Sequence, residues 1–443
     1  MSSVTRRGLL QSVGGVGLAT LAAGPSPRAA AALQVGASAD KEPVFTFVSM
    51  PDFFNGDVAD LSRLERWDNG ANSVNDSWQQ AIDRCLGFVG DHRPDAVFLA
   101  GDMVEGHWNI DSHDRELFGP VNQRIDAESL QMGRSAIRVA GDVHYSFAAD
   151  QFSRHRLKVY PAVGDHEILD DRAGPLNQRW KPGGWTHGQR DNRYYLVPHA
   201  KKVWADHFTT PGGVPRFKRR PIGTEVEKTA YAVSFADQVT LITVDMFAHR
   251  KHGVRLGVFG GQLEWLEHEI RRAKRRGHVV IVQGHIPTMM PTRYMASGRL
   301  HLPEGRSSGF YRVLDRAGAD LFLCGEVHDS TVIQHGRHAP VQISHGCVFR
   351  LAFSYLVGRV YASGKVRLDL FEVPITEASR EEDLWCCDDK KRQRTHIVYG
   401  DPIHRGKIRM HGRTIHKRTA KLGRYHPAHD PYGLAGNLGT KLV

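Results

Sequence analysis

The sequence predicts a mixed α/β fold in which short buried strands alternate with helices. Apolar runs of strand length are separated by segments with helical spacing of apolar residues. The expected strands are 44–50, 97–101, 157–163, 231–235, 239–244, 278–283 and 320–324, and the expected helices are 76–89, 260–276 and 310–317. Polar residues follow several strands directly. Since ligands bind at the carboxyl ends of strands in open α/β sheets, we expect the functional site at that edge.

Two long stretches show neither the helical nor the strand spacing of apolar residues. Residues 107–156 and 170–220 are polar or rich in Gly, Pro, Trp and Tyr, and we expect them to be irregular insertions forming a rim over the site. Three or four short strands are expected up to about residue 373. From residue 377 the composition becomes strongly basic.

The overall composition is that of an ordinary globular protein with excess positive charge. The chain has 443 residues and a formal net charge of +11. This charge favours anionic substrates or surfaces but does not determine the fold. Five scattered cysteines exclude a disulfide scaffold, and without a CxxC pair they do not predict a zinc knuckle.

The N-terminus has the layout of an export signal. Arg6 and Arg7 precede a short apolar stretch, and small residues with A-x-A spacing follow. We interpret residues 1–32 as a twin-arginine signal peptide and expect a secreted or periplasmic protein. The apolar stretch is shorter than the roughly 20 residues of a membrane-spanning helix, and no later stretch is long enough, so no stable membrane span is expected.

Five short motifs occur in order at the predicted strand ends. They are Asp52, Gly101-Asp102, Gly164-Asp165-His166-Glu167, Gly284-His285 and Gly325-Glu326-Val327-His328. Each motif alone is weak evidence for a particular function. Together they resemble the five blocks of the calcineurin-like metallophosphoesterases, written D-x-H, G-D, G-N-H-(D/E), G-H and G-H-x-H.

The resemblance implies a four-layer α/β/β/α sandwich over residues 43–375, with long inserted loops and a basic C-terminal extension over 377–443. It also implies one or two divalent metal ions. Asp102 would bridge them, Asp52 and His328 would hold the first, and Asp165, His285 and Glu326 would hold the second. A metal-activated hydroxide would attack phosphorus, His166 would act as general acid, and Glu167 would orient His166.

Three positions depart from the family pattern. Phe54 replaces the histidine of the first block, Asp165 replaces an asparagine, and Glu326 replaces a histidine. Asn55 and Asp57 are candidate substitutes but lack the spacing, and His345 is a further candidate. The more oxygen-rich set favours Mn, Fe or Mg over Zn. We expect the second side of the site to bind metal more firmly than the first.

The sequence thus predicts a metal-dependent hydrolase of phosphate esters. Alternatives are a nuclease or lipid phosphodiesterase, favoured by the basic charge, and a non-catalytic phosphopolymer-binding protein with a degraded site. The basic extension could be solvated, could bind a polyanion, or could add strands to the domain, which its alternating segments 406–410 and 414–416 favour. The natural substrate, the ester class and the oligomeric state stay open.

Overall fold

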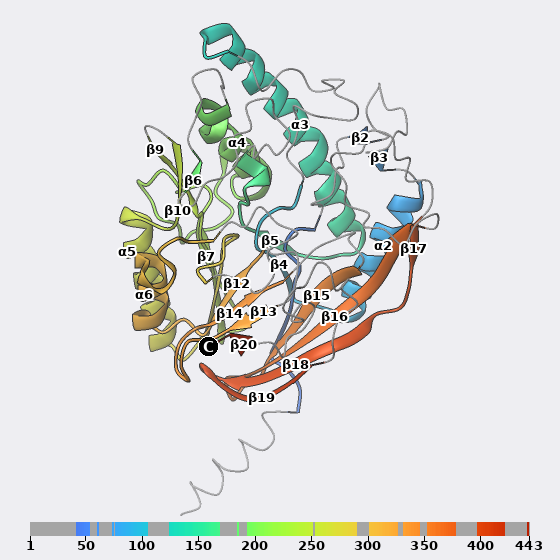
Figure 1. The fold of residues 1–443 in the computed structure, drawn as a ribbon, viewed down its shortest axis with the longest axis vertical. Helices are drawn as coiled ribbons and strands as arrows, with labels where there is room; N and C mark the ends of the chain where they lie inside the picture. The colour runs from blue at the N-terminus through green and yellow to red at the C-terminus, as the bar shows by residue number, and fades with distance from the viewer. Residues whose placement is uncertain are drawn as a thin grey trace, which may run out of the picture. The chain divides into compact units, whose positions relative to one another are not determined.

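The predicted strands assemble into two large β-sheets in a computed structural model of the chain (Figure 1). The structure describes residues 41–53, 60–61, 73–74, 76–104, 124–168, 184–185, 193–250, 253–289, 301–326, 331–345, 352–377, 397–420 and 441–442. Residues 42–443 form one compact unit. The signal-peptide prediction lies outside the described residues.

The first sheet has the order β19-β18-β16-β15-β1-β4-β5, and β17 also pairs with β16. Strands β1, β4 and β5 are parallel, and the remaining pairings are antiparallel. The bounds are β1 Phe45–Ser49, β4 Ala96–Leu99, β5 Val159–Pro161, β15 Ala352–Val360, β16 Lys365–Glu377, β17 Ile397–Tyr399, β18 Ile403–His411 and β19 Thr414–Ala420.

The second sheet has the order β20-β13-β14-β12-β11-β8-β7. Its central strands β8, β11, β12 and β14 are parallel, so their carboxyl ends meet at one edge. The bounds are β7 Tyr231–Phe235, β8 Val239–Thr243, β11 Val279–Gln283, β12 Leu321–Cys324, β13 Thr331–Ile333, β14 Val341–Ser344 and β20 Lys441–Leu442. All the strands expected from the sequence are present.

The two sheets face each other across a shared apolar core. Phe47 and Phe98 of the first sheet belong to one buried cluster with Leu241, Ile281 and Leu323 of the second. Helices cover the outer faces, with α2 (Asp76–Asp91) beside the first sheet and α5 (Gly260–Arg275) and α6 (Gly309–Ala317) beside the second (Figure 1). The expected α/β/β/α sandwich is therefore confirmed.

Smaller elements surround this sandwich. They are the pair β2 (Asp60–Leu61) and β3 (Ser73–Val74), the sheet of β6 (Gly184–Trp185), β10 (Gly253–Leu256) and β9 (Phe247–Arg250), and the short helices η2 (His166–Ile168), η3 (Pro211–Gly213) and η4 (Gly305–Ser307). Among the described residues, every helix is too short or too polar to cross a membrane.

The expectation of an irregular insertion over 107–156 is wrong for much of its length. Helix α3 (Ala127–Arg154) is 28 residues long and lies against α4 (Arg193–Phe208). Half of its buried positions are Ser, Ala or Gly, including Ala136, Ala140 and Gly141, so the sequence shows little amphipathic contrast. A Cβ on Gly141 would lie 2.4 Å from Val203 Cγ1, which shows that the two helices need a residue without a side chain there.

The second expected irregular stretch, 170–220, also contains a helix. Helix α4 begins at Arg193 and carries Pro198 in its interior. Proline cannot donate the helical hydrogen bond and usually ends a helix, so the sequence argued against one here. Burial of Leu196, Val197, Val203 and Trp204 stabilises α4 in spite of Pro198.

The described part of the basic C-terminal extension adds strands to the first sheet, as its alternation suggested. Strand β18 pairs with β16 and β19 pairs with β18. Arg413, between these strands, donates hydrogen bonds to Leu314 O (2.7 Å) and Ala319 O (2.8 Å) at the end of α6. The boundary expected near residue 375 therefore lies inside β16, within a single compact unit.

Candidate metal centre

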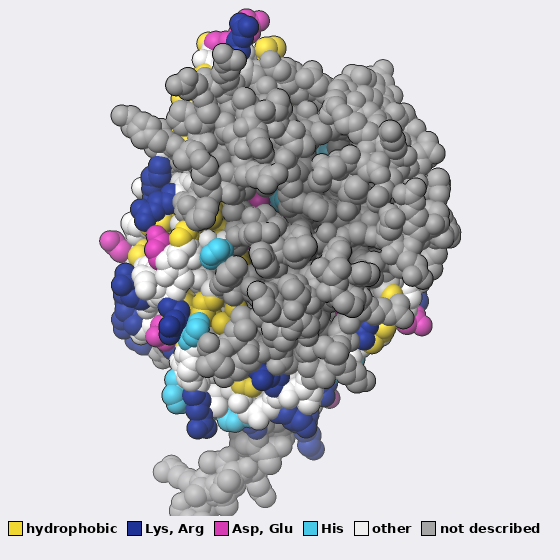
Figure 2. Space-filling view, viewed as in Figure 1, with side chains coloured by type: hydrophobic (Ala, Val, Ile, Leu, Met, Phe, Trp, Pro, Cys, Tyr) yellow, Lys and Arg dark blue, Asp and Glu magenta, His cyan; other side chains and the backbone are white. Residues whose placement is uncertain are grey.

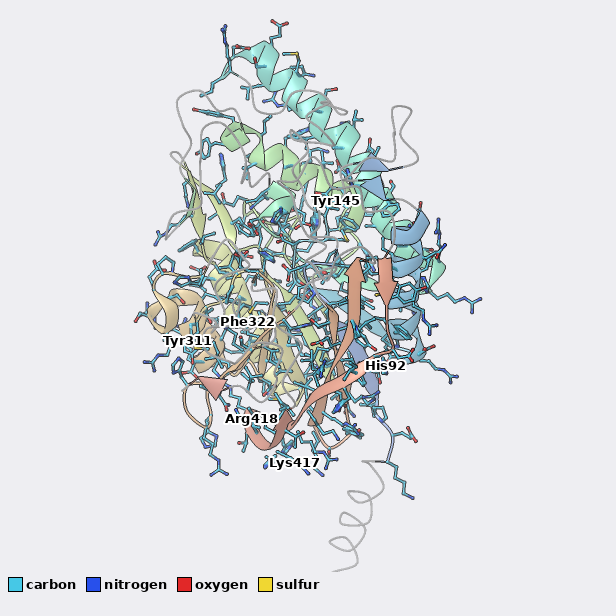
Figure 3. All side chains as sticks on the ribbon, turned by 45° about the vertical axis from the view of Figure 1, so that its right-hand side comes forward. His92, Tyr145, Tyr311, Phe322, Lys417 and Arg418 are labelled. Atoms are coloured by element: carbon cyan, nitrogen blue, oxygen red, sulfur yellow. The ribbon has the colours of Figure 1, made fainter. Side chains whose placement is uncertain are left out.

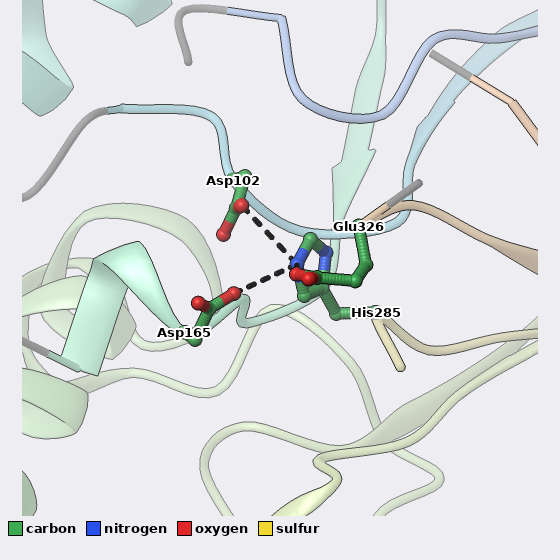
Figure 4. Close-up of side chains that lie close together, drawn as sticks. All are labelled: Asp102, Asp165, His285 and Glu326. Atoms are coloured by element: carbon green, nitrogen blue, oxygen red, sulfur yellow. Dashed lines mark ion pairs between the residues drawn. The ribbon is translucent and has the colours of Figure 1, made fainter. Parts of the chain in front are cut away.

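Four side chains converge at the carboxyl ends of the parallel strands. Asp102, Asp165, His285 and Glu326 are buried, and each offers a ligand atom within 4.8 Å of the others (Figure 4). The Nε2 atom of His285 lies 2.9 Å from Asp165 Oδ1, 3.1 Å from Asp102 Oδ2 and 3.5 Å from Glu326 Oε2. The two sheets thus contribute one nitrogen and three carboxylates to one place.

The backbone turns sharply where these residues leave their strands. Asp52, Asp102 and Glu326 have φ angles of 58°, 53° and 68°, in the left-handed region that few residues other than glycine adopt. Such a conformation costs roughly 1–2 kcal/mol per residue. Three of them at one edge are maintained by the surrounding packing, a pattern that is typical of functional sites.

The glycines of the sequence motifs let the blocks approach one another. A Cβ on Gly164 would lie 2.0 Å from Asp102 Oδ1, and a Cβ on Gly325 would lie 2.8 Å from Asp52 Oδ2. A Cβ on Gly101 would lie 2.6 Å from His285 Nδ1. A side chain at Gly101, Gly164 or Gly325 would displace a neighbouring carboxylate or imidazole, which explains why glycine precedes the polar residue in the second, third and fifth blocks.

Glu167 fixes the loop that carries Asp102. Its carboxylate accepts hydrogen bonds from the backbone amides of Gly164 (2.6 Å), Met103 (2.7 Å), Asp102 (3.0 Å) and Val104 (3.3 Å). The expected role of orienting His166 does not account for these four bonds. Glu167 joins the second and third blocks, because its two oxygens accept hydrogen bonds from amides of both.

His285 is held with one nitrogen toward the carboxylates. Its Nδ1 lies 2.8 Å from Ala100 O. Since a carbonyl oxygen only accepts hydrogen bonds, Nδ1 must carry a hydrogen. The other ring nitrogen, Nε2, therefore faces the three carboxylates, and it would offer them a lone pair whenever the ring is neutral. Burial lowers the pKa of His285, but the charge of Asp102 and hydrogen bonds with Asp102, Asp165 and Glu326 outweigh it and raise the pKa well above its usual value.

The family model for calcineurin-like phosphoesterases matches residues 58–330. The chain belongs to the calcineurin-like phosphoesterase family. It is therefore a hydrolase acting on phosphoesters, in a family that uses metal ions, and the buried Asp/His/Glu cluster could hold a divalent metal ion.

Solved structures with the same general fold are distant. This phosphoesterase resembles a dimetal phosphatase from Danio rerio with 13% identity and a TM-score of 0.44, over 81% of this chain and 99% of that chain. It resembles a purple acid phosphatase from yellow lupin (Lupinus luteus) seeds with 11% identity and a TM-score of 0.41, over 74% of this chain and 51% of that chain. Curated proteins gave no match.

The charge of the phosphoesterase site fits a bound divalent cation. Burial raises the pKa of Asp102 well above its usual value, and the charge of Asp165 raises it further. Burial likewise raises the pKa of Asp52 to about 8. Carboxylates resist ionisation here because water is excluded, and a divalent cation would reverse that preference. Three oxygens and one imidazole nitrogen suit Mn²⁺, Fe²⁺ or Zn²⁺ and, among harder ions, Mg²⁺.

The first side of the predicted two-metal site is described only in part. Asp52 is buried at the end of β1, and its Oδ1 accepts a hydrogen bond of 3.1 Å from Glu326 N. This bond joins the first and fifth blocks. His328, Asn55, Asp57 and Phe54 lie outside the described residues, so the structure brings together four of the six predicted ligands and places Asp52 beside them.

The other two predicted site residues are both buried. The backbone N–H of His166 donates to Asp102 Oδ1 (3.2 Å), and His166 Nε2 lies 3.7 Å from Asp102 Oδ2. His345 follows β14, and its Nε2 lies 2.8 Å from Ser49 Oγ at the end of β1. Burial lowers the pKa of His345 to about 3, so the ring is neutral and joins the two sheets beneath the site.

Sequence reasoning missed the residues that support the site from α3 and α4. Lys201 is buried and donates to Asp245 Oδ2 (2.7 Å) and to Phe247 O. Burial raises the pKa of Tyr145 well above its usual value, and the charge of Glu167 raises it further. Both residues lie in stretches that showed no clear period, so only the packing of these helices could have identified them.

Proposed function

We propose that this chain hydrolyses a small phosphate ester at the cluster of Asp102, Asp165, His285 and Glu326. The observation that carries the proposal is the position of His285 Nε2 within 3.5 Å of three buried carboxylates. An excess of buried negative charge is unfavourable unless a cation neutralises it. The residues that could bind a metal ion are therefore the same residues that the sequence motifs place at the strand ends.

The residues have separable roles in this proposal. Bound divalent ions would supply an activated water and charge stabilisation of the phosphoryl oxygens. Glu167 would hold the Asp102 loop in place through its four amide bonds. His166, whose Nε2 lies 3.7 Å from Asp102, would donate a proton to the leaving oxygen.

The proposal includes a second metal position on the side of Asp52. Asp52 and His328 would be its ligands, with Asp102 shared between the positions. Asn55 and Asp57 are the candidates to replace the histidine that Phe54 displaces, and His345 is a separate candidate member of the site. Because this side has fewer ligands, we expect it to lose its ion first during dialysis against a weak chelator.

Two synthetic esters test the proposal. We expect turnover of p-nitrophenyl phosphate in the presence of Mn²⁺, and loss of turnover with excess chelator. A strong preference for bis-p-nitrophenyl phosphate would instead support the nuclease or lipid phosphodiesterase alternative. Failure to hydrolyse either ester, by protein shown to contain metal, would contradict the proposal.

We also propose that residues 1–32 direct export of the folded protein. The paired Arg6 and Arg7 before a short apolar stretch support this proposal. Changing both to lysine should leave the protein in the cytoplasm of a bacterial host that has the twin-arginine pathway. Unchanged export of the double variant would contradict it.

A further inference from the structure

A row of basic residues crosses four neighbouring strands of the first sheet. Arg359 of β15 lies opposite Arg367 of β16, Arg367 lies opposite Arg409 of β18, and Arg409 lies opposite Lys417 of β19. Neighbouring strands are about 4.8 Å apart, so the four residues form a line of cations across the sheet. We call these four residues the basic row.

The basic row lies on the outer face of the sheet. Leu356, Leu368 and Ile408 point into the core between the sheets. Since side chains alternate along a strand, the odd-numbered Arg359, Arg367 and Arg409 point the opposite way. The side chains of Arg359 and Arg367 are 24% and 36% exposed, and Arg409 and Lys417 are exposed.

One half of the basic row is partly neutralised by a shared carboxylate and the other half is not. Arg359 and Arg367 both pair with Asp369, at 3.2 Å and 2.6 Å. Among the described residues, no carboxylate pairs with Arg409 or Lys417. Lys407 lies opposite Asp369 in the strand register and adds another cation next to this half. The β18–β19 end of the row is therefore the part available to an anionic partner.

Like charges directly opposite each other destabilise a sheet. The basic row contains three such pairs in succession, so we expect it to lower the stability of the fold slightly. Charged residues on an edge strand also prevent unwanted strand pairing. That role would account for Lys417 on β19, but it does not require Arg367 and Arg409, which lie on interior strands.

Helix α2 covers the upper part of the same face and leaves the row uncovered. His92, just after α2, lies beside Phe371 with ring centroids 4.9 Å apart and ring planes tilted by 41°, and its Nε2 lies 3.4 Å from Tyr355 Oη. Arg359 follows four residues after Tyr355 along β15. Figure 3 shows Lys417 at the lower end of the β18–β19 hairpin with His92 above it, and in Figure 2 Lys and Arg side chains gather at that lower end.

We propose that the basic row binds a linear chain of phosphates and thereby holds the enzyme on a phosphate-rich polymer. One guanidinium group can donate two hydrogen bonds to the oxygens of a phosphate. A line of cations fits the repeated charges of a polymer better than it fits a single small anion. Arg359 lies opposite Thr46, six residues before Asp52. At about 3.3 Å per residue, the row is roughly 20 Å from the metal centre. It would therefore anchor the polymer without contacting the reacting ester.

Salt-dependent binding of labelled inorganic polyphosphate tests the proposal. Contacts with Lys407, Arg409 and Lys417 should give a slope of log Kd against log salt of about 2–3, since each contributes about 0.7–0.9. The double variant R409Q/K417Q should lower the slope by about 1.5 and weaken binding roughly 10- to 30-fold. Its hydrolysis of p-nitrophenyl phosphate should be unchanged, which shows that the fold and the metal centre are intact.

The matched control is R134Q/R138Q, which removes two exposed cations from α3. The control should change the affinity for polyphosphate less than about threefold, the size expected from net charge alone. An equal loss in the control, or no binding by the wild type at low salt, would overturn the proposal. So would binding to phosphatidylserine vesicles without binding to polyphosphate, which would assign the row to a membrane surface. None of these outcomes depends on the ester that the active site hydrolyses.

Discussion

Two regions of this protein concentrate like charges, and burial makes them different. At the carboxyl ends of the strands, Asp102, Asp165 and Glu326 are buried around one imidazole. On the outer face of the first sheet, Arg409 and Lys417 are exposed to water and salt. Exposed like charges repel weakly because water screens them, whereas buried ones shift their pKa values or require a counter-ion. We therefore expect the first region to need a bound cation to function, and the second to attract an anion without needing one.

The largest effect is expected from Asp102→Asn. Removing the shared carboxylate should lower the activity by at least about 100-fold, because even residues that only support metal ligands contribute 10- to 100-fold. Steady-state hydrolysis of p-nitrophenyl phosphate measures the loss. In chelated protein the same change should raise the melting temperature, since it removes a carboxyl group whose ionised form burial disfavours. Nearly unchanged activity would show that Asp102 is not a ligand.

A somewhat smaller effect is expected from Glu167→Gln. The amide keeps one acceptor oxygen but cannot accept the four backbone bonds, so the Asp102 loop should loosen. We expect a 10- to 100-fold loss of activity together with weaker metal binding. His166→Gln is the matched comparison, and it should lower activity while metal affinity stays near the wild-type value. If both variants lost activity with unchanged affinity, Glu167 would act through His166 after all.

The metal-free protein should lose stability as pH rises from about 4 to 8. The pKa of Asp52 is about 8 in the folded protein against 3.8 for the free side chain, so folding favours its protonated form. That contribution is fully present below pH 3.8 and is lost as pH rises through 8. The raised pKa of His285 acts in the same direction. Thermal unfolding with and without Mn²⁺ should show a metal-induced stabilisation that grows over this window. A stabilisation independent of pH would contradict the assignment of these groups as ligands.

The smallest effect is expected in the basic row. Arg409→Gln removes one member of two like-charged cross-strand pairs, so it should change the free energy of unfolding by no more than about 0.5 kcal/mol, and toward higher stability. Urea unfolding at low and high salt measures it, and the gain should shrink at high salt. Destabilisation by more than about 1 kcal/mol would show that Arg409 supports the fold.

The sequence pointed to the Asp102 cluster because its residues follow strands directly. The ligand roles of Asp102 and His285 were expected from the resemblance of these short motifs to the blocks of the family, and the structure brings the two residues together. The role of Glu167 was not predictable, because its partners are backbone amides of another block. Helix α3 was missed because half of its buried face consists of small residues such as Ala140 and Gly141, and α4 because it lies in a stretch rich in Gly and Pro that includes Pro198.

The basic row was also invisible in the sequence. Its members span Arg359 to Lys417, and their alignment depends on strand register. That register includes a shift between Arg409 and Met410 in the pairing of β18 with β19. The sequence showed a basic extension and an alternating pattern, which correctly favoured added strands. It could not show which cations would lie opposite each other.

Metal content is the most direct test of the central claim. Protein loaded with Mn²⁺ and then dialysed should be compared with Asp102→Asn by elemental analysis, with both shown to be folded by circular dichroism. We expect at least one ion per wild-type chain and much less in the variant. Equal metal content in the two proteins, or none in the wild type, would contradict the assignment of Asp102, Asp165, His285 and Glu326 as the metal centre.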